Sequence, residues 1–333
     1  MVGVRAFGIV DMGTNIIEVR PTSLCPLSCI FCSVNAGPRS DIRWAEFTVE
    51  PDVLFEAVRE IVNYKSCDNI EVHIDGMGEP GTYHKLCELI QLLREIPEVK
   101  VISMQTRLVT FNEKKILELA DAGLDRINLS VDAVDPELAK KLAGTEWYNV
   151  NRVLELAKFT IDNTRIDVVL APVWVPTLND EEIPKLIEWA KKAGAGKRWP
   201  PVLIQKYVPH KHGRKPDVPV MSWDEFFRKL RELEKVYNVK LIPSMEDFNI
   251  FKTRKLPQTF RKGEVLKVEI LCRGIFKNEY IAIPVKLRGS HVYDRVITVI
   301  ASSKLESVLI GQRIKVRIIE DKNNIYLAEP VNL

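Results

Sequence analysis

The sequence predicts an α/β fold in which an open (β/α)6 partial barrel is followed by a small all-β barrel. The first observation is an alternation of apolar strands and amphipathic helices from residue 16 to residue 243. The second is a change of period further along, where short runs alternate polar and apolar residues at close spacing. Strands separated by helices require crossover connections, which give a parallel sheet. We therefore expect a large domain at 1–244, a linker at 245–260 and a small domain at 261–333.

Six strands are expected to form the large domain, and their apolar character predicts burial on both faces of the sheet. The predicted strands are 16–20, 70–75, 99–104, 126–131, 166–175 and 201–207, with a short extra strand at 240–242. The predicted helices are 50–64, 82–95, 112–122, 135–142, 149–162, 180–193 and 222–237. A complete parallel barrel needs eight strand–helix units, so six units predict an open, curved sheet whose functional site lies at the carboxyl ends of the strands.

The C-terminal part of the chain is predicted to be a basic β-barrel. Its predicted strands are 264–270, 280–284, 295–299, 312–319 and 325–329. Residues 261–333 contain thirteen Lys or Arg and eight Asp or Glu, a net charge of +5, whereas the rest of the chain carries −2. A basic barrel attached to an enzyme is suited to docking a phosphate backbone. The alternative is a capping or oligomerisation module whose basic face is merely solvated.

The composition indicates a cytoplasmic protein. Apolar residues make up 46% of the chain, which is enough for a packed core, yet no run of eighteen apolar residues predicts a membrane span. The first residues lack the charged start, apolar segment and cleavage site of a signal peptide. Three of the six cysteines, Cys67, Cys87 and Cys272, are scattered along the chain, and we expect reduced thiols.

The other three cysteines form the strongest motif of the sequence. Cys25, Cys29 and Cys32 have the spacing C-x3-C-x2-C directly after the first strand. Thiolates on one tight loop can turn toward a single [4Fe–4S] cluster, and three ligands leave one iron open for a substrate or cofactor. A structural zinc ion ordinarily takes four ligands, and no fourth Cys or His stands at zinc-finger spacing. A disulfide is disfavoured because three is an odd number in a chain of cytosolic character.

This motif and its position resemble the radical S-adenosylmethionine (SAM) superfamily, and the resemblance covers roughly residues 16–243. It implies an open partial barrel, a [4Fe–4S] cluster held by the three cysteines, and SAM chelated by the open iron. It also implies that the reduced cluster cleaves SAM to a 5′-deoxyadenosyl radical, which abstracts a hydrogen atom from the substrate. A low-potential electron donor is then required.

The resemblance also implies SAM-binding residues at the ends of the strands. Gly78, Glu79 and Pro80 follow the second strand and resemble the family's Gly-Gly-Glu-Pro segment, with Met77 at its altered first position. Glycine there permits the backbone to approach the SAM ammonium group closely. A simple turn between a strand and a helix is the alternative for this segment.

Further SAM contacts are expected after the next strands. Gln105 or the residue after it is expected at the SAM ribose or carboxylate, although Arg107 departs from the family's Asn-Gly at that point. Asn128, Ser130 and Asp132 alternate along the fourth strand, so we expect one polar row facing the barrel interior.

The fifth strand is expected to supply the adenine contact. The backbone near Val173 is expected to line the adenine, and Trp174 is expected to pack in the core. Asp135 is predicted to cap the helix that follows the fourth strand, and Asn179 or Asp180 the helix that follows the fifth.

Two groups of basic residues are candidates for contact with RNA. The first group follows the sixth strand and consists of Lys206, His210, Lys211, Arg214 and Lys215. The second lies on the fourth strand of the small barrel and consists of Arg313, Lys315 and Arg317. Such residues attract phosphates, although a solvated loop is the alternative for the first group.

The small barrel resembles a TRAM domain, a β-barrel attached to several RNA-modifying enzymes. The likeness rests on Gly263-Glu264-Val265 and on residues 311–318. Together with segments of the core such as Arg20-Pro21-Thr22, the chain resembles an archaeal-type group that joins a radical SAM core to a TRAM domain. The resemblance implies an RNA partner, with tRNA as the first choice. No membrane partner is expected, because no apolar run is long enough to span a membrane.

Three functions stay open at this point. The first is radical modification of RNA, for which the reaction and its catalytic residues are not specified by the sequence. The second is a radical SAM enzyme acting on a peptide or a small metabolite. The third is an RNA-binding protein whose cluster is structural or senses redox state.

Overall fold

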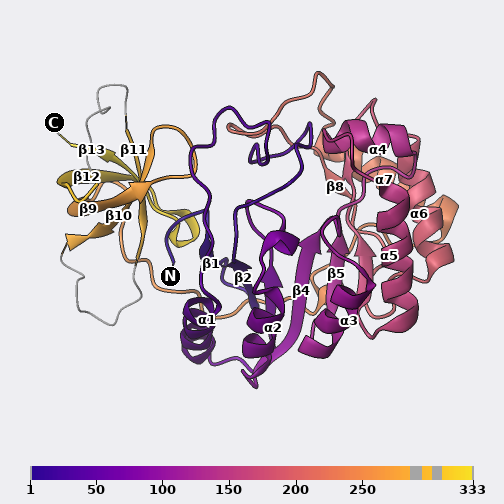
Figure 1. The fold of residues 1–333 in the computed structure, drawn as a ribbon, viewed down its shortest axis with the longest axis horizontal. Coiled ribbons are helices and arrows are strands. Elements are labelled where there is room, and N and C mark those ends of the chain that lie inside the picture. Colours follow the sequence, from indigo (N-terminus) through magenta and orange to yellow (C-terminus); the bar gives the residue numbers. More distant parts are fainter. Residues whose placement is uncertain (1, 286–294, 302–309, 332–333) are drawn as a thin grey trace.

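A computed structural model describes residues 2–285, 295–301 and 310–331. Figure 1 shows two parts: a curved sheet with its helices, and a small barrel at one end of the molecule. Both parts agree with the fold class predicted from the sequence. In the described ranges, no helix combines the length and the apolar character that crossing a membrane requires.

The large sheet has six strands in chain order. Its parallel strands are β2 (Ile16–Arg20), β3 (Ile70–Ile74), β4 (Val99–Thr106), β5 (Arg126–Leu129) and β6 (Asp167–Leu170). Edge strand β1 (Gly8–Asp11) pairs antiparallel with β2. This strand was not predicted, because four residues are too few to show a period. It extends the parallel sheet with one antiparallel edge strand.

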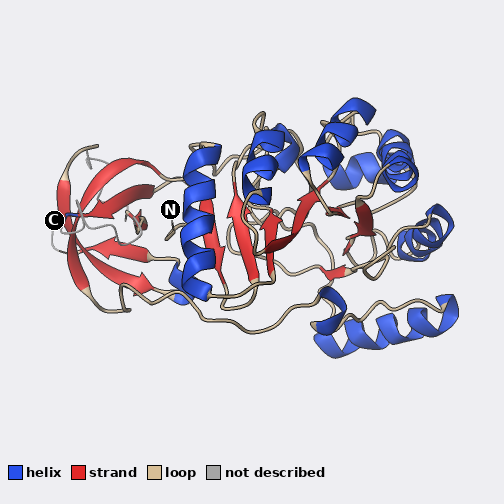
Figure 2. Cartoon of the chain, turned by 90° about the horizontal axis from the view of Figure 1, so that it is seen from below, coloured by secondary structure: helices blue, strands red, loops and turns tan. Residues whose placement is uncertain are grey.

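In the described part of the chain, seven α-helices connect or follow these strands, and Figure 2 shows them along the outside of the sheet. They are α1 (Pro51–Lys65), α2 (Leu86–Arg94), α3 (Glu113–Ala122), α4 (Pro136–Ala143), α5 (Val150–Asn163), α6 (Glu182–Ala193) and α7 (Trp223–Tyr237). All seven were predicted. Helix α2 begins four residues later than expected, after the short 3-10 turn η1 (Pro80–Thr82).

The last strands of the core differ from the prediction. The fifth predicted strand is broken into β6 and the two-residue β7 (Val173–Trp174), since Pro172 has no N–H with which to continue the ladder. The sixth is only β8 (Gln205–Lys206), paired in parallel with β7. The predicted strand at 240–242 is wrong: two backbone N–H groups there donate to the Glu234 carboxylate at 2.7 and 2.9 Å.

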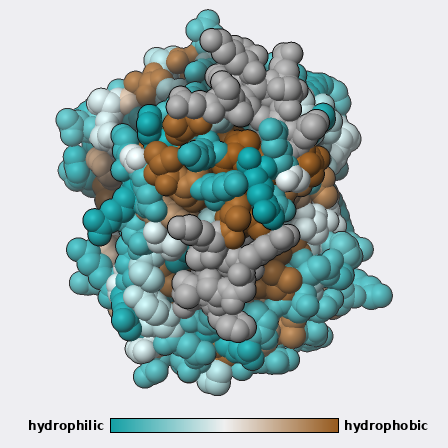
Figure 3. All heavy atoms as spheres, turned by 90° about the vertical axis from the view of Figure 1, so that its left-hand side faces the viewer, coloured by the Kyte–Doolittle hydropathy of each residue, from teal (hydrophilic) through white to brown (hydrophobic). Residues whose placement is uncertain are grey.

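The C-terminal strands close into a five-stranded barrel, as predicted. They are β9 (Val265–Arg273), β10 (Glu279–Pro284), β11 (Ile297–Ile300), β12 (Arg313–Glu320) and β13 (Leu327–Pro330), in the order β10-β11-β13-β12-β9. The barrel has its own apolar core, separate from that of the large sheet. Figure 3 looks onto this end of the molecule, where hydrophilic and hydrophobic side chains lie side by side.

The barrel contacts the core through the turn between β9 and β10. Trp44 N–H donates to the Ile275 carbonyl at 2.8 Å, and Lys277 N–H donates to the Ile42 carbonyl at 2.9 Å. The Arg273 guanidinium lies 4.0 Å from the centroid of the Trp44 ring. The segment that precedes the barrel includes η2 (Glu246–Phe248) and runs back along the core. These contacts bring one end of the barrel beside the residues that follow the cysteine motif.

Candidate active site

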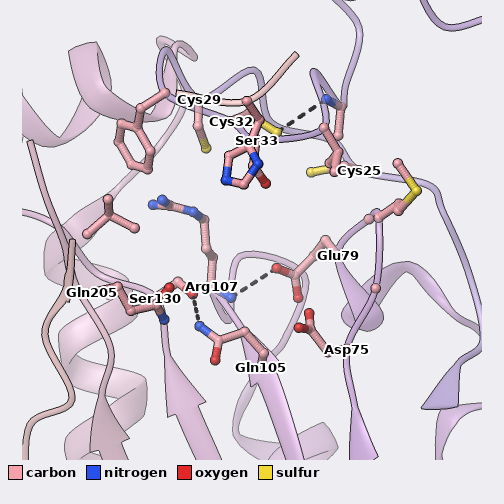
Figure 4. Close-up of a pocket in the computed structure, with 18 of the residues that line it drawn as sticks. Cys25, Cys29, Cys32, Ser33, Asp75, Glu79, Gln105, Arg107, Ser130 and Gln205 are labelled. Carbon is pink, nitrogen blue, oxygen red and sulfur yellow. Dashed lines mark hydrogen bonds between the residues drawn. The ribbon is translucent and has the colours of Figure 1, made fainter. Parts of the chain in front are cut away.

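A cavity of about 280 Å³ opens at the carboxyl ends of the strands and contains the three motif cysteines (Figure 4). It is also lined by seven other predicted site residues: Gly78, Glu79, Gln105, Ser130, Val173, Lys206 and His210. Pro80 and Asp132 do not line it. The structure therefore gathers most of the predicted cofactor residues around one space.

The cysteine loop is held by the C-terminal end of α4. Ser28 N–H donates to the Ala143 carbonyl at 3.1 Å, and Ile30 N–H donates to the Leu142 carbonyl at 3.0 Å. Gly144 adopts a left-handed conformation with φ of 60°, and a Cβ there would lie 2.1 Å from the Ser28 carbonyl oxygen. Only glycine permits this approach, so the end of α4 fixes the loop that carries the thiols.

The thiol environment suits a cluster. Burial raises the pKa of Cys25 to about 12 and that of Cys29 to about 11, so these thiols stay protonated until a metal replaces the proton. The Ala36 N–H donates to Cys32 Sγ at 3.3 Å. Across the described ranges, no three His, Cys, Asp or Glu side chains are close enough to hold a single metal ion. A cubane cluster takes each thiolate on a different iron, which suits three thiols spread around one cavity.

Glu79 fixes the turn that follows β3. The backbone N–H of this residue donates to the Leu24 carbonyl at 2.7 Å. The carboxylate accepts from the N–H groups of Arg107 and Gly81 at 2.9 and 3.2 Å and from the Thr106 hydroxyl. Burial raises the pKa of Glu79, and these donors oppose that rise. The carboxylate is thus engaged within the protein and positions the backbone on either side of it.

Gly78 allows this turn to lie against the segment that leads into the cysteine loop. A Cβ at Gly78 would lie 2.3 Å from the Leu24 carbonyl oxygen. Arg43, which the sequence did not single out, holds the same turn from the other side. Its guanidinium donates to the carbonyls of Met77 and Ser23, each at 2.8 Å. A lone arginine in a loop gives no sequence signal for such a contact.

Only part of the expected polar row reaches the cavity. Gln105 Nε2 donates to Ser130 Oγ at 2.5 Å, and both residues line the cavity. Asn128 instead lines a second cavity, which lies closer to the amino-terminal ends of the same strands. Asn128 and Ser130 thus both face the interior of the curved sheet, as expected, but they line two different cavities, and Asp132 lines neither of them.

The Asp132 carboxylate is hydrogen-bonded to neighbouring groups of the protein. Its carboxylate accepts from Arg107 Nη2 at 2.5 Å and from the Val173 N–H at 2.8 Å. Burial lowers the pKa of Arg107, but the Asp132 charge, together with smaller contributions from Cys29 and Tyr148, raises that pKa well above its ordinary value. The guanidinium lines the cavity beside Cys29, so the pair places a fixed positive charge near the thiols.

Asp75 is a further cavity residue that sequence reasoning missed. It directly follows β3 and points into the cavity close to Glu79 and Gln105 (Figure 4). Burial, then the negative charge of Glu18, raises the pKa of Asp75 to about 7. An acidic residue before a glycine resembles any turn in the sequence, and only the fold shows that it faces the cavity.

The structure confirms two of the structural assignments and corrects one. Trp174 is buried and donates from Nε1 to the Asp180 carboxylate at 2.7 Å, as a packed core residue does. Asp135 caps α4 by accepting from the Leu138 N–H at 2.8 Å. Neither Asn179 nor Asp180 caps α6, whose N-cap position is Glu181. Asn179 instead accepts from the Val175 N–H at 2.8 Å.

The basic residues of β8 and of the loop after it fall into two groups, those that line the cavity and those that do not. Lys206 and His210 line the cavity, whereas Lys211 and Lys215 are exposed elsewhere. Arg214 is tied to the cysteine loop: its N–H donates to the Cys32 carbonyl at 2.9 Å, and its guanidinium donates to the Cys29 carbonyl at 3.2 Å. Arg214 is therefore placed to support the loop.

The predicted basic residues of the barrel lie on one strand. Arg313, Lys315 and Arg317 alternate along β12 and are all exposed, while the residues between them are buried. Arg313 forms an ion pair with Glu269 on β9 at 3.0 Å. Lys315 lies directly opposite Lys267 of β9, which is also exposed.

Comparison with known proteins agrees with this geometry. The family model for the radical SAM superfamily matches residues 19–190. The protein MJ0103 of Methanocaldococcus jannaschii is 38% identical over 99% of this chain and 78% of its own length. A probable GTP 3′,8-cyclase of the same organism is 28% identical over 54% of this chain and 56% of its own length. The chain thus spans about half the length of the cyclases that it matches.

Solved structures share the fold at low sequence identity. Streptococcus suis SuiB matches with a TM-score of 0.53 and 18% identity, covering 72% of this chain and 49% of that protein. The structure of anSMEcpe with bound AdoMet matches with a TM-score of 0.52 and 16% identity, covering 68% of this chain and 62% of that protein.

Proposed function

The chain belongs to the radical SAM superfamily, and from that premise we propose that it modifies RNA, with tRNA as the substrate class. Members of the family use a [4Fe–4S] cluster and SAM, and the residues around the cavity fit both. When bound, the cluster supplies the electron that cleaves SAM to a 5′-deoxyadenosyl radical. The side chains of the protein determine where the cluster, SAM and the substrate are held.

In this proposal, the thiols of Cys25, Cys29 and Cys32 hold the cluster. The backbone at Gly78 and the side chains of Gln105 and Ser130 hold SAM on the opposite side of the cavity. The Glu79 carboxylate and the Arg107–Asp132 pair hold the surrounding backbone in place and do not bind SAM themselves, because their polar atoms already have protein partners. Val173 adds an apolar wall for the adenine ring.

The observation that carries the RNA proposal is the pair Lys267 and Lys315. The two residues face each other across β9 and β12, and both are exposed. Like charges at directly opposite positions destabilise a β-ladder. A polyanion lying over the two strands would neutralise this repulsion and release counterions. The pair is therefore better explained by a phosphate backbone than by a solvated capping module.

The surroundings of this pair extend the charged surface toward the cavity. Arg317 lies two residues from Lys315 on the same exposed face of β12. At the other end of β9, Arg273 stacks on Trp44, a residue that is 42% exposed. The β9–β10 turn reaches the basic loop, where Phe276 stacks on His212 at 4.4 Å between ring centroids.

The mixed character of the surface also favours nucleic acid. Val265 and Leu271 on β9 are 47% and 41% exposed beside the basic residues. Bases offer apolar faces and phosphates offer charge, so a surface with both kinds of side chain can bind a single strand. A closed barrel of five strands with such a face supports the proposed likeness to a TRAM domain.

A second candidate substrate is a small purine nucleotide. The GTP 3′,8-cyclases match the core of this chain, and their name states the nucleotide on which they act. Lys206 and His210 at the rim of the cavity are suited to phosphate groups. This candidate gives the β12 surface no role, which is why RNA is preferred.

The test compares RNA binding by the wild type and by the double variant Lys267→Glu, Lys315→Glu. Reversing two contacts with phosphate should lower the affinity for tRNA at least tenfold and reduce its salt dependence. The control is Lys114→Glu, a charge reversal at an 86% exposed side chain on α3 that should leave the affinity unchanged. Equal affinities of all three proteins for tRNA would contradict the proposal and favour the nucleotide.

A further inference from the structure

A second cavity lies inside the curved sheet, on the side away from the cysteines. Its volume is about 350 Å³, and it is lined from β2, β3 and β5 and from the segment at 243–250. No residue lines both this space and the cluster cavity. We call it the lower cavity.

The two cavities are stacked along the same strands. On β3, His73 lines the lower cavity, and Asp75, two residues later, lines the cluster cavity. Asn128 and Ser130 repeat this arrangement at β5. Two residues along a strand correspond to about 7 Å. The floor between the cavities is therefore about one layer of side chains thick.

The polar wall of the lower cavity has a defined donor and acceptor pattern. The Ser103 hydroxyl donates its proton to the Glu71 carboxylate at 2.6 Å. Its oxygen must then accept the hydrogen bond from His73 Nδ1 at 2.7 Å. Because Nδ1 carries the proton, Nε2 of the neutral imidazole is a hydrogen-bond acceptor. Burial, and then the charge of Arg126, lowers the pKa of His73 to about 3 and keeps the ring neutral.

Asn128 supplies the complementary donor. Its Oδ1 accepts from Arg126 Nε at 3.0 Å, which fixes the orientation of the amide. Its Nδ2 group has no hydrogen-bond partner within the described ranges, and the residue lines the cavity. This group is therefore available to donate a hydrogen bond to a ligand in the cavity.

Apart from Ser244, the remaining wall is apolar, and the whole wall carries no net charge. Ile16, Met245 and Phe248 are among the apolar residues that line it. The charges of Glu71 and Arg126 in this wall pair with each other, and both side chains are 4% exposed. A charged ligand would lose its hydration without gaining an opposite charge. The volume lies at the lower end of the range for small-molecule sites.

We propose that the lower cavity is a binding site for a small neutral molecule that carries an amide-type edge. The ligand's N–H would donate to His73 Nε2, and its carbonyl oxygen would accept from Asn128 Nδ2. The class includes primary amides, lactams and nucleobases. This site is independent of the RNA proposal, because it lies on the opposite side of the cavity floor from SAM.

Benzamide is a suitable probe, since it joins a primary amide to an apolar ring. Its binding to the full-length protein is measured by ligand-detected NMR, with a Kd of about 1 mM or lower expected for a ligand of this size. Benzoate has nearly the same shape but a negative charge, and it should bind at least tenfold more weakly. SAM should not compete with benzamide.

Two variants test the location. His73→Phe removes the hydrogen-bond acceptor while keeping a ring of similar size. Met245→Trp places a larger side chain at Met245, a lining residue that is 47% exposed, and should block entry to the lower cavity. Each should weaken benzamide binding at least tenfold, while SAM affinity shows that the variant is folded. The control Lys114→Glu should bind benzamide normally.

Several outcomes would overturn the proposal. They are no benzamide binding at 10 mM, equal binding of benzoate, competition by SAM, or unchanged affinity in both variants. A crystal soaked with benzamide should place the amide within hydrogen-bond distance of His73 Nε2 and Asn128 Nδ2; density only in the cluster cavity would contradict it. None of these results depends on whether RNA is the substrate.

Discussion

Arg107 donates a hydrogen bond from Nη2 to the Asp132 carboxylate at 2.5 Å, next to the partly buried Cys29. The exposed fractions of the two side chains are 11% and 1%. The carboxylate also accepts from the Val173 N–H, so one acidic residue joins the ends of β4, β5 and β7. This arrangement makes Asp132 a support of the site.

Asp132→Asn is expected to lower the free energy of unfolding by about 3 kcal/mol, because it leaves the Arg107 charge buried without its counter-ion. Urea denaturation of the apo protein measures this change. The control is Asp121→Asn, an exposed residue of α3, which should change the free energy by less than about 0.5 kcal/mol. If Asp132→Asn also changed the free energy of unfolding by less than about 0.5 kcal/mol, the Arg107–Asp132 pair would not support the site.

Cys29→Ala is expected to abolish the cluster and the cleavage of SAM, since it removes one of three ligands. Anaerobic reconstitution followed by absorbance spectroscopy and assay of 5′-deoxyadenosine measures both. Cys67→Ala is the matched control, because Cys67 is also partly buried but does not line the cavity. Cluster formation in Cys29→Ala, or its loss in Cys67→Ala, would refute the ligand assignment.

Asp75 predicts a specific dependence of stability on pH. The pKa of Asp75 is raised from about 3.9 in the unfolded chain to about 7 in the folded protein. Between these values the folded state holds a proton that the unfolded state has released, so stability falls as pH rises from about 4 to 7. The slope from this one group is at most about 1.4 kcal/mol per pH unit.

Asp75→Asn should remove that slope and make the variant more stable than the wild type at pH 8. Melting temperatures of the apo proteins at pH 5 and pH 8 test this, with Asp121→Asn as the control. A wild type and an Asp75→Asn variant that respond identically to pH would show that Asp75 titrates normally.

The sequence was sufficient to predict features that depend on local pattern. Residue spacing was enough to predict that the three motif cysteines share one loop, and hydrophobic period was enough to predict the helices and the five strands of the barrel. The structure contains all of these features. Asp135 shows that helix caps can also be predicted, since the capping contact spans only three residues.

Features that depend on distant contacts could not be predicted. Asp132 lies at the strand end where SAM contacts were expected, but its partner Arg107 is 25 residues away and takes its carboxylate. Arg43 reaches Met77 across 34 residues. The alternation of Asn128 and Ser130 was visible in the sequence, whereas the layer that separates their two cavities is a property of the assembled sheet.

The most direct test of the central claim is mass spectrometry of nucleosides from tRNA and rRNA of a strain that lacks the gene, compared with its parent. The proposal predicts that one modified nucleoside is missing or replaced by its precursor, and that the gene restores it while a Cys29→Ala version does not. Identical nucleoside profiles in both RNA pools would contradict an RNA substrate and leave a peptide or a small metabolite as the target of the radical chemistry.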